Sequence, residues 1–358
     1  MVEQELDLTD TEEERAVALH ADAVVIDGLA ICRNYFETEG YVDHLHRGGV
    51  NAGNFTVAHS GTPDFESCVD ELVRLRDGVE TRDDAVVVES AADLRAAKAA
   101  GDIAVIVGFQ ASRPIGTDLR RLRAFDHLGT RIVQLTYNDQ NYVGAGCCER
   151  NDGGLTCFGR DLIDELQARN ILIDLSHCGD TTTEEAVEYA DDPVAFTHVG
   201  VRELCPAYGR CKTDEQIRAV AEGGGVIGLT LFPPFVRRDP DTHKILPATI
   251  QDVLDAIDHV VNLVGSGHVG FGTDINDVYL DEGRTPAFSS LRTYRPRNPE
   301  VFGHGPVDRY DPFPAGLDRH TKLPNLTRGL VARGYTDDEI RGILGENFLR
   351  LFETVWEG

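Results

Sequence analysis

The stretch that decides the fold is ILIDLSHCGDTTTEEAVEYADDPVAFTHVG, residues 171–200. It contains two short apolar runs, at 171–176 and 193–197, and each run is followed directly by a histidine. Apolar runs of this length, bounded by polar segments, are typical of buried strands in a parallel sheet. We therefore expect two neighbouring parallel strands that present their histidines at equivalent heights.

Working outward from this stretch, short apolar runs alternate with amphipathic segments along the chain, which indicates a parallel sheet. The expected strands are 23–30, 51–59, 103–110, 130–137, 171–176, 193–197, 225–232 and 268–274, with a further one at 85–90. Eight strands in one α/β domain of this size predict a single closed (β/α)8 barrel of the TIM type. Such a barrel carries its chemistry on the loops at the carboxyl ends of the strands.

The remaining segments are placed around this barrel. We expect an acidic N-terminal segment over 1–22 and the barrel over 23–358, closed by a final helix over 337–356. The stretch from about 276 to 322 is rich in Pro, Gly, Asp and Arg and has neither helical nor strand periodicity. It is predicted to be an irregular surface excursion.

Charge and cysteine content exclude several classes of protein. The 358 residues carry 61 Asp and Glu against 34 Lys and Arg, a formal net charge of −27, so nucleic acid is an unsuitable partner. No apolar stretch is long enough for a membrane helix and the start is acidic, so we expect a cytoplasmic protein without a membrane partner. The eight dispersed cysteines form no C-x-x-C pair, which favours free thiols. The sequence leaves open whether the protein forms a homo-oligomer.

Two histidines and one aspartate end expected strands. His177 and His198 follow neighbouring strands, and neutral imidazole is a common ligand of divalent metals. Asp274 ends the last strand, where a carboxylate could bind metal or take a proton from an activated water. The alternatives are histidines satisfied by hydrogen bonds alone and an aspartate that caps a helix.

The sequence resembles a known family over most of its middle. The resemblance rests on runs in the same order: LGTRIVQLTYNDQN, GLTCFGRDLIDELQARNILIDLSH, PVAFTHVGVREL, GRCKTDEQIRAVAEGGGVIGL and GFGTD. These runs are similar to those of the membrane (renal) dipeptidases, the M19 metallopeptidases. The resemblance implies an amidohydrolase-like barrel with a two-zinc site that cleaves dipeptides.

Four positions match the family's site pattern. The resemblance implies metal ligands at His177 and His198, and a catalytic or ammonium-binding carboxylate at Asp274. It also implies that the guanidinium of Arg210, in GRCKTD, binds the terminal carboxylate of the substrate through two parallel hydrogen bonds.

Other positions depart from that pattern. Where the family's first strand reads D-G-H-x-D, this chain has Leu29 and Ile31 in place of the two metal ligands. Gln110 replaces the bridging glutamate, and Tyr137 replaces a substrate-contacting histidine. The chain resembles a divergent branch of the family that carries D-G-L, G-F-Q and L-T-Y-N.

These replacements are mutually consistent, because a site with one ion needs no anionic bridge. We expect at most one divalent ion, with zinc as the first candidate, held by His177 and His198. Gln110, His59 or Cys147 could supply a third ligand. Alternatively, Cys147 could be a thiol nucleophile activated by a nearby histidine.

The expected function is hydrolysis of a small peptide or amide bond by metal-activated water, in a dipeptidase-like metallohydrolase that acts on a dipeptide or another small molecule. Two alternatives stay open. One is a different small-molecule amidase or lactonase, including a metal-free enzyme that uses Cys147. The other is a binding protein that keeps the pocket without the chemistry.

The charge balance predicts a halophilic protein that loses stability at low ionic strength, because its excess negative charges repel one another more strongly when salt screens them less. Urea midpoints in about 0.1 M and about 3 M KCl should differ, with the higher midpoint at high salt. Equal midpoints would contradict the halophilic interpretation.

Overall fold

Eight parallel strands form the centre of the molecule, in the computed structural model that describes residues 6–30, 36, 40–58, 62, 64–275, 289–305 and 312–357. The strands are β1 (Ile26–Ala30), β2 (Ala52–Ala58), β4 (Ile103–Phe109), β5 (Thr130–Gln134), β6 (Leu172–Asp174), β7 (Ala195–Val201), β9 (Val226–Thr230) and β10 (Val269–Gly272). They follow one another in the sheet in chain order, which confirms the predicted (β/α)8 barrel.

Two further short strands extend this sheet. The expected β3 (Ala85–Val87) pairs with β4 outside the main path. The other, β8 (Cys211–Lys212), pairs with β7 and was not predicted, because two residues are too few to produce a hydrophobic period.

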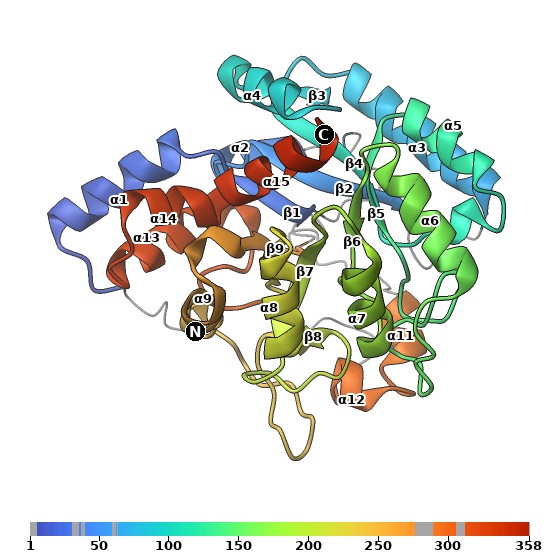
Figure 1. Ribbon diagram of the computed structural model, residues 1–358. Coiled ribbons are helices and arrows are strands. Elements are labelled where there is room, and N and C mark those ends of the chain that lie inside the picture. The colour runs from blue at the N-terminus through green and yellow to red at the C-terminus, as the bar shows by residue number, and fades with distance from the viewer. Residues whose placement is uncertain are drawn as a thin grey trace.

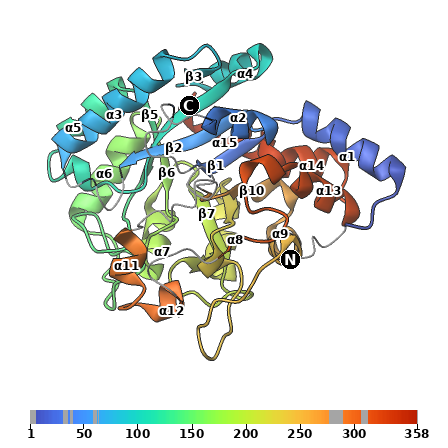
Figure 2. The same ribbon diagram turned by 180° about the vertical axis from the view of Figure 1, so that it is seen from behind.

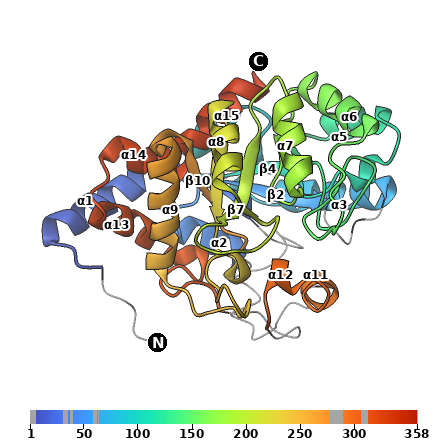
Figure 3. The same cartoon turned by 60° about the horizontal axis from the view of Figure 1, so that its bottom comes forward.

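Helices cover the outside of the strands. They are α1 (Asp10–Asp22), α2 (Tyr41–Arg47), α3 (Phe65–Glu80), α4 (Ala91–Ala100), α5 (Arg120–His127), α6 (Cys157–Gln167), α7 (Asp180–Tyr189), α8 (Asp214–Glu222), α9 (Ile250–Val264), α11 (Ser289–Tyr294), α12 (Pro299–Phe302), α13 (Pro324–Ala332), α14 (Asp337–Arg341) and α15 (Asn347–Trp356). Figure 3 shows α7, α8 and α9 side by side along one flank. Several begin at a threonine or serine cap, as Thr213 does for α8.

One end of the barrel is closed by aromatic side chains of α15. Phe348 lies against the strand starts, and Phe352 stacks on Trp356 with ring centroids 4.1 Å apart. Burying each such ring contributes about 1.5–3 kcal/mol. Figures 1 and 2 show α15 at this end and the short helices α11 and α12 at the opposite end, where the strands finish. The end at which barrels of this type carry their chemistry is therefore the end with α11 and α12.

The seam between the first and last strands is closed by a buried side chain. The Thr273 backbone N–H donates to Asp27 Oδ1 at 2.7 Å, and the Thr273 hydroxyl donates to Asp27 Oδ2 at 2.6 Å. The Asp274 N–H then donates to the carbonyl of Leu29 at 3.0 Å. We call this arrangement of one aspartate and one threonine on adjacent strands an aspartate–threonine clamp.

A second aspartate–threonine clamp joins β6 to β7. These strands share a single paired position, Asp174 with Ala195. Asp174 Oδ1 accepts from the Thr197 N–H at 3.1 Å and Oδ2 accepts from the Thr197 hydroxyl at 2.7 Å. In both clamps, the residue after the threonine is a predicted site residue, Asp274 or His198.

The N-terminal segment and the described parts of the excursion contain helices that their composition did not predict. Helix α1, within the acidic N-terminal segment, lies beside α13, and Glu13 forms an ion pair with Arg328 at 2.6 Å. In the excursion, the described parts include α11 and α12, and Tyr294 and Phe302 are buried there. Six- and four-residue helices are too short to show an apolar period.

The expected final helix is interrupted. A π-helical segment, Gly342–Glu346, separates α14 from α15. A Cβ at Gly345 would lie 2.3 Å from the carbonyl oxygen of Val24, so only glycine permits this close approach to the chain before β1. Across the described ranges, no helix combines the length and apolar character needed to cross a bilayer.

Close packing inside the barrel gives a stability prediction at Gly28. A Cβ there would lie 2.6 Å from the Thr197 carbonyl oxygen and 3.0 Å from that of Phe271. Gly28→Ala should lower the free energy of unfolding by about 1–3 kcal/mol. Gly153→Ala is the control, since nothing lies within 4 Å of its added Cβ, and it should change stability by less than about 0.5 kcal/mol. Equal urea midpoints for both variants would contradict this packing.

Candidate active site

Two histidine rings meet where β6 ends and alongside the middle of β7, a strand that continues past its expected end at residue 197. His177 follows β6 and His198 lies within β7, and both are buried. Their Nε2 atoms are 3.0 Å apart and their ring centroids 5.0 Å apart. The structure therefore brings together the two imidazoles that the sequence placed at matched strand ends.

Hydrogen bonds on the far side of each ring determine which nitrogen carries the proton. His177 Nδ1 lies 2.8 Å from Asn138 Oδ1, a carbonyl oxygen that can only accept. His198 Nδ1 lies 2.8 Å from the Thr197 hydroxyl oxygen, which gives its own proton to Asp174. Each Nδ1 must therefore donate, and each Nε2 carries an unprotonated lone pair.

Two lone pairs that face each other at 3.0 Å repel unless a cation lies beside them. Burial is the main cause, and the positive charge of Arg210 the second, that holds the pKa of both His177 and His198 well below the ordinary range. At neutral pH a proton therefore does not act as the cation between the two rings. Two zinc–nitrogen bonds at a tetrahedral angle place their nitrogens about 3.3 Å apart. The observed spacing therefore fits a divalent ion shared by the two rings.

Gln110 and Tyr137 lie against the two rings. Gln110 Nε2 donates to His198 Nε2 at 3.3 Å, and half a turn of this amide would present its oxygen instead. Tyr137 stacks on His177 with centroids 4.2 Å apart and planes 17° apart. Among the described residues, no group of three His, Cys, Asp or Glu side chains could hold a metal. His59 lies outside the described residues.

Arg210 is fully buried behind the two rings. Its Nη1 donates to the Ser176 carbonyl at 2.7 Å and its Nη2 donates to the His198 carbonyl at 3.1 Å. The guanidinium also lies 4.6 Å from the centroid of the Phe235 ring. In the part of the chain that the structure describes, Arg210 Nε has no partner. Arg210 thus braces both histidine-bearing segments through their backbone carbonyls.

Asp274 is partly exposed and has a left-handed backbone, with φ of 56°. Burial raises the pKa of Asp274 to about 7, the charge of Arg210 opposes this rise, and the neighbouring Asp27 adds to it. A carboxyl group with a pKa near neutrality can accept a proton and return it. The Asp274 carboxyl therefore has the ionisation range that acid–base chemistry near neutral pH requires.

Cys147 is buried next to the histidines without touching a ring nitrogen in any described hydrogen bond. Its thiol donates to Asn138 Oδ1 at 3.3 Å, the same oxygen that accepts from His177. Burial alone would raise the pKa of Cys147, but a hydrogen bond from Cys148 and the charges of Arg210 and Lys212 lower it overall. The thiol lies beside an acceptor and not beside a base.

Four buried polar residues of the site were not among the predicted site residues. Asn138, Asp174, Thr197 and Lys212 support the histidines or the loops that follow them. Lys212 Nζ donates to the Cys178 carbonyl at 2.8 Å, and burial lowers its pKa to about 8. A signal was present in the sequence, because Asp174 and Thr197 interrupt otherwise apolar strands.

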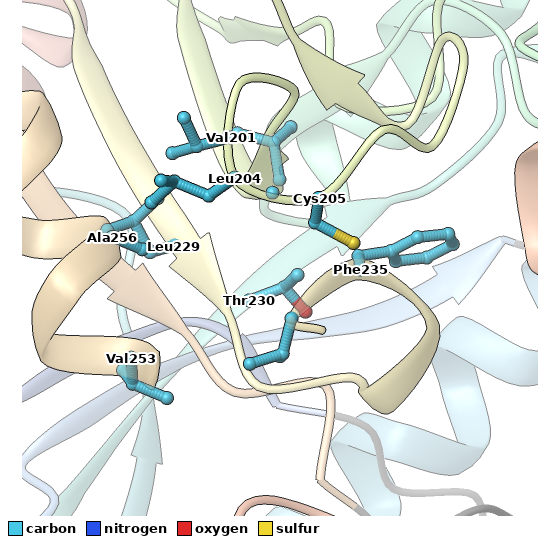
Figure 4. Close-up of a pocket in the computed structure, with 11 residues that line it drawn as sticks. Val201, Leu204, Cys205, Leu229, Thr230, Phe235, Val253 and Ala256 are labelled. Atoms are coloured by element: carbon cyan, nitrogen blue, oxygen red, sulfur yellow. The ribbon is translucent and has the colours of Figure 1, made fainter. Parts of the chain in front are cut away.

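A pocket near β7 lies outside this site. Figure 4 shows it between the end of β7, β9 and α9, with Val201, Leu229 and Val253 among its lining residues. Val199 lines this pocket, and adjacent strand residues point to opposite faces, so His198 points into the barrel instead. The pocket is mainly apolar and contains none of the predicted site residues.

A parallel (β/α)8 barrel with facing histidines at neighbouring strand ends has the architecture of the metal-dependent hydrolases. The chain belongs to the membrane dipeptidase family, peptidase family M19, whose profile matches residues 10–281 and 303–357. It is 28% identical over 258 residues to dipeptidase aclJ of Aspergillus oryzae, covering 71% of this chain and 52% of that protein. The chain spans about half the length of the curated dipeptidases that it matches.

Solved structures show the same fold. An amidohydrolase from Pseudomonas aeruginosa superposes with a TM-score of 0.83 at 32% identity, covering 96% of this chain and 99% of that one. A metallopeptidase from Rhodobacter sphaeroides, liganded with a phosphinate mimic of L-Ala-D-Ala, has a TM-score of 0.75 at 22% identity, covering 94% and 100%. The predicted family is confirmed.

The raised pKa of Asp274 predicts a pH-dependent stability of the metal-free protein. Between about pH 4 and pH 7 the unfolded chain has lost this proton while the folded chain keeps it, so stability falls as pH rises. Asp274→Asn removes that contribution, and asparagine tolerates the left-handed backbone. Urea midpoints of the wild type, measured with a chelator, should fall more steeply with pH than those of the variant. Parallel profiles would contradict the shift.

Proposed function

We propose that this protein is a dipeptidase-like metallohydrolase that cleaves a small peptide or amide bond with one divalent ion. The observation that carries the proposal is the pair of Nε2 atoms, of His177 and His198, that lie 3.0 Å apart in a buried site. Family membership supports hydrolysis. The ion count follows from the replacements at Leu29, Ile31 and Gln110, which leave the two histidines as the strongest ligands.

His177 and His198 would hold the ion, with the Gln110 amide oxygen as a weaker third ligand. When bound, the ion would lower the pKa of a water and polarise the scissile carbonyl. Asp274 would take the proton released in that step and return it to the leaving amine, as its pKa near 7 allows. The Tyr137 ring, stacked on His177, would form one wall.

An anionic end of the substrate is the third part of the proposal. Arg210 and Lys212 are both fully buried, and none of their described contacts is with a carboxylate. Unneutralised buried cations favour an anion nearby. The free N–H groups of Arg210 would bind the terminal carboxylate of a dipeptide, the ligand class that the related metallopeptidase holds as a phosphinate mimic.

The proposal predicts about one zinc per chain in protein purified without a histidine tag. His177→Ala and His198→Ala should each lower zinc content and dipeptide turnover by about tenfold or more, since each removes a ligand. His127→Ala is the matched control, because this exposed imidazole on α5 lies outside the site. The measurements are elemental analysis and hydrolysis of a dipeptide panel that includes D-residues.

Cys147→Ser separates the metal mechanism from a thiol mechanism. Retained zinc with retained turnover supports the proposal, because the described acceptor of the thiol proton is Asn138 and not a base. Retained zinc with abolished turnover would favour the thiol-based amidase or lactonase. Binding of dipeptides without turnover, in protein loaded with zinc, manganese or cobalt, would instead indicate a binding protein.

A further inference from the structure

We infer that Asp174 sets the tautomer of His198 through the hydroxyl of Thr197, and so acts as a positioning residue of the site. The three groups form one line of hydrogen bonds. Asp174 Oδ2 lies 2.7 Å from the Thr197 hydroxyl oxygen, and this oxygen lies 2.8 Å from His198 Nδ1. All three residues are buried, so water does not compete for these protons.

The direction of each hydrogen bond follows from counting donors at Asp174. Its Oδ1 accepts from the Ser176 N–H at 2.9 Å, the Ser176 hydroxyl at 2.5 Å and the Thr197 N–H at 3.1 Å. Its Oδ2 has the Thr197 hydroxyl as its described partner. Burial raises the pKa of Asp174, and the hydrogen bonds from Ser176 and Thr197 oppose that rise. An ionised carboxylate only accepts, so the single hydroxyl proton of Thr197 points to Asp174.

The Thr197 hydroxyl oxygen can then only accept from the imidazole. His198 Nδ1 must carry the proton, which leaves Nε2 free on the side that faces His177. The neighbouring Ser176 hydroxyl does not alter this result, because its proton goes to Asp174 and its oxygen accepts from the His198 backbone N–H at 3.1 Å. The Asp174 carboxylate thus determines whether His198 Nε2, on the opposite side of the ring, carries a proton.

The Asp27 clamp provides an internal comparison. Asp27 Oδ1 and Oδ2 accept from the Thr273 N–H and hydroxyl as in the Asp174 clamp. There the hydroxyl oxygen accepts from the Ile275 N–H at 3.2 Å and lies 3.4 Å from His320 Nε2, which is itself 3.3 Å from the carboxylate. A change at Asp27 therefore tests loss of a clamp without touching His198.

Asp174→Asn inverts the line of hydrogen bonds by a near-isosteric change. The asparagine oxygen would keep the three donors at the Oδ1 position, and its NH2 group would donate to the Thr197 hydroxyl. That hydroxyl must then give its proton to His198 Nδ1, which forces the proton of the ring onto Nε2. A nitrogen in that state cannot bind a metal.

The experiment is an imidazole 1H–15N correlation spectrum of metal-free protein labelled at histidine, with the His198 signals assigned from a His198→Gln variant. The wild type should show the Nδ1–H tautomer of His198, and Asp174→Asn should show the Nε2–H tautomer. Asp27→Asn should leave the His198 signals in the wild-type form. Zinc titrated alone into the apo protein should bind about 10–100-fold more weakly to Asp174→Asn.

Threonine variants keep the test decisive if Asp174→Asn fails to fold. Thr197→Val removes the acceptor and should lower the Nδ1–H population, and Thr197→Ser should restore it. A wild type with the proton on Nε2, or an Nδ1–H tautomer that survives in Asp174→Asn or Thr197→Val, would overturn the inference. Only the zinc result rests on the proposed function: a tautomer switch in a protein that binds no zinc would support this inference and refute that function.

Discussion

The site depends on one unfavourable contact, two unprotonated imidazole nitrogens held 3.0 Å apart inside the barrel. Such a contact persists only because the surrounding structure fixes both rings. His177 is held by Asn138 and by the stacked Tyr137 ring. The Thr197 hydroxyl and the backbone of β7 hold His198. The free energy of folding therefore includes the repulsion between the two lone pairs, and a bound cation would relieve that repulsion.

Rigidity of this kind comes from buried polar groups that form hydrogen bonds between segments far apart in the chain. Two of the cations nearest the histidines, Arg210 and Lys212, donate mainly to backbone carbonyls of the loops that follow β6 and β7. These bonds tie the loops to each other and leave the positive charge itself without a described carboxylate partner. The same side chains thus hold the histidine-bearing segments in place while their charges stay buried in the barrel.

Much of this arrangement could be predicted from the sequence, because it depends on the hydrophobic periodicity of short segments. The apolar runs before His177 and His198 gave neighbouring strands, and the barrel rule then placed both rings at one end. The roles of Asp174 and Thr197 could not be predicted, since their contacts cross between strands and depend on register. The same limit applies to the fold itself. The π-helical break at Gly345 arises from contact with Val24, far away in the chain, and a two-residue strand such as β8 has no period to detect.

The Asp27 clamp has a consequence for how such families diverge. In this chain the first residue of the pattern, Asp27, joins the first and last strands through Thr273, and so has a structural role that needs no metal. Loss of Asp27 would therefore weaken the fold itself, whereas Leu29 replaces a metal ligand without opening this joint. A partly retained motif can therefore reflect a structural contact and not a working metal site. Common ancestry can be inferred from the retained aspartate, but catalytic activity has to be inferred from the metal-binding positions.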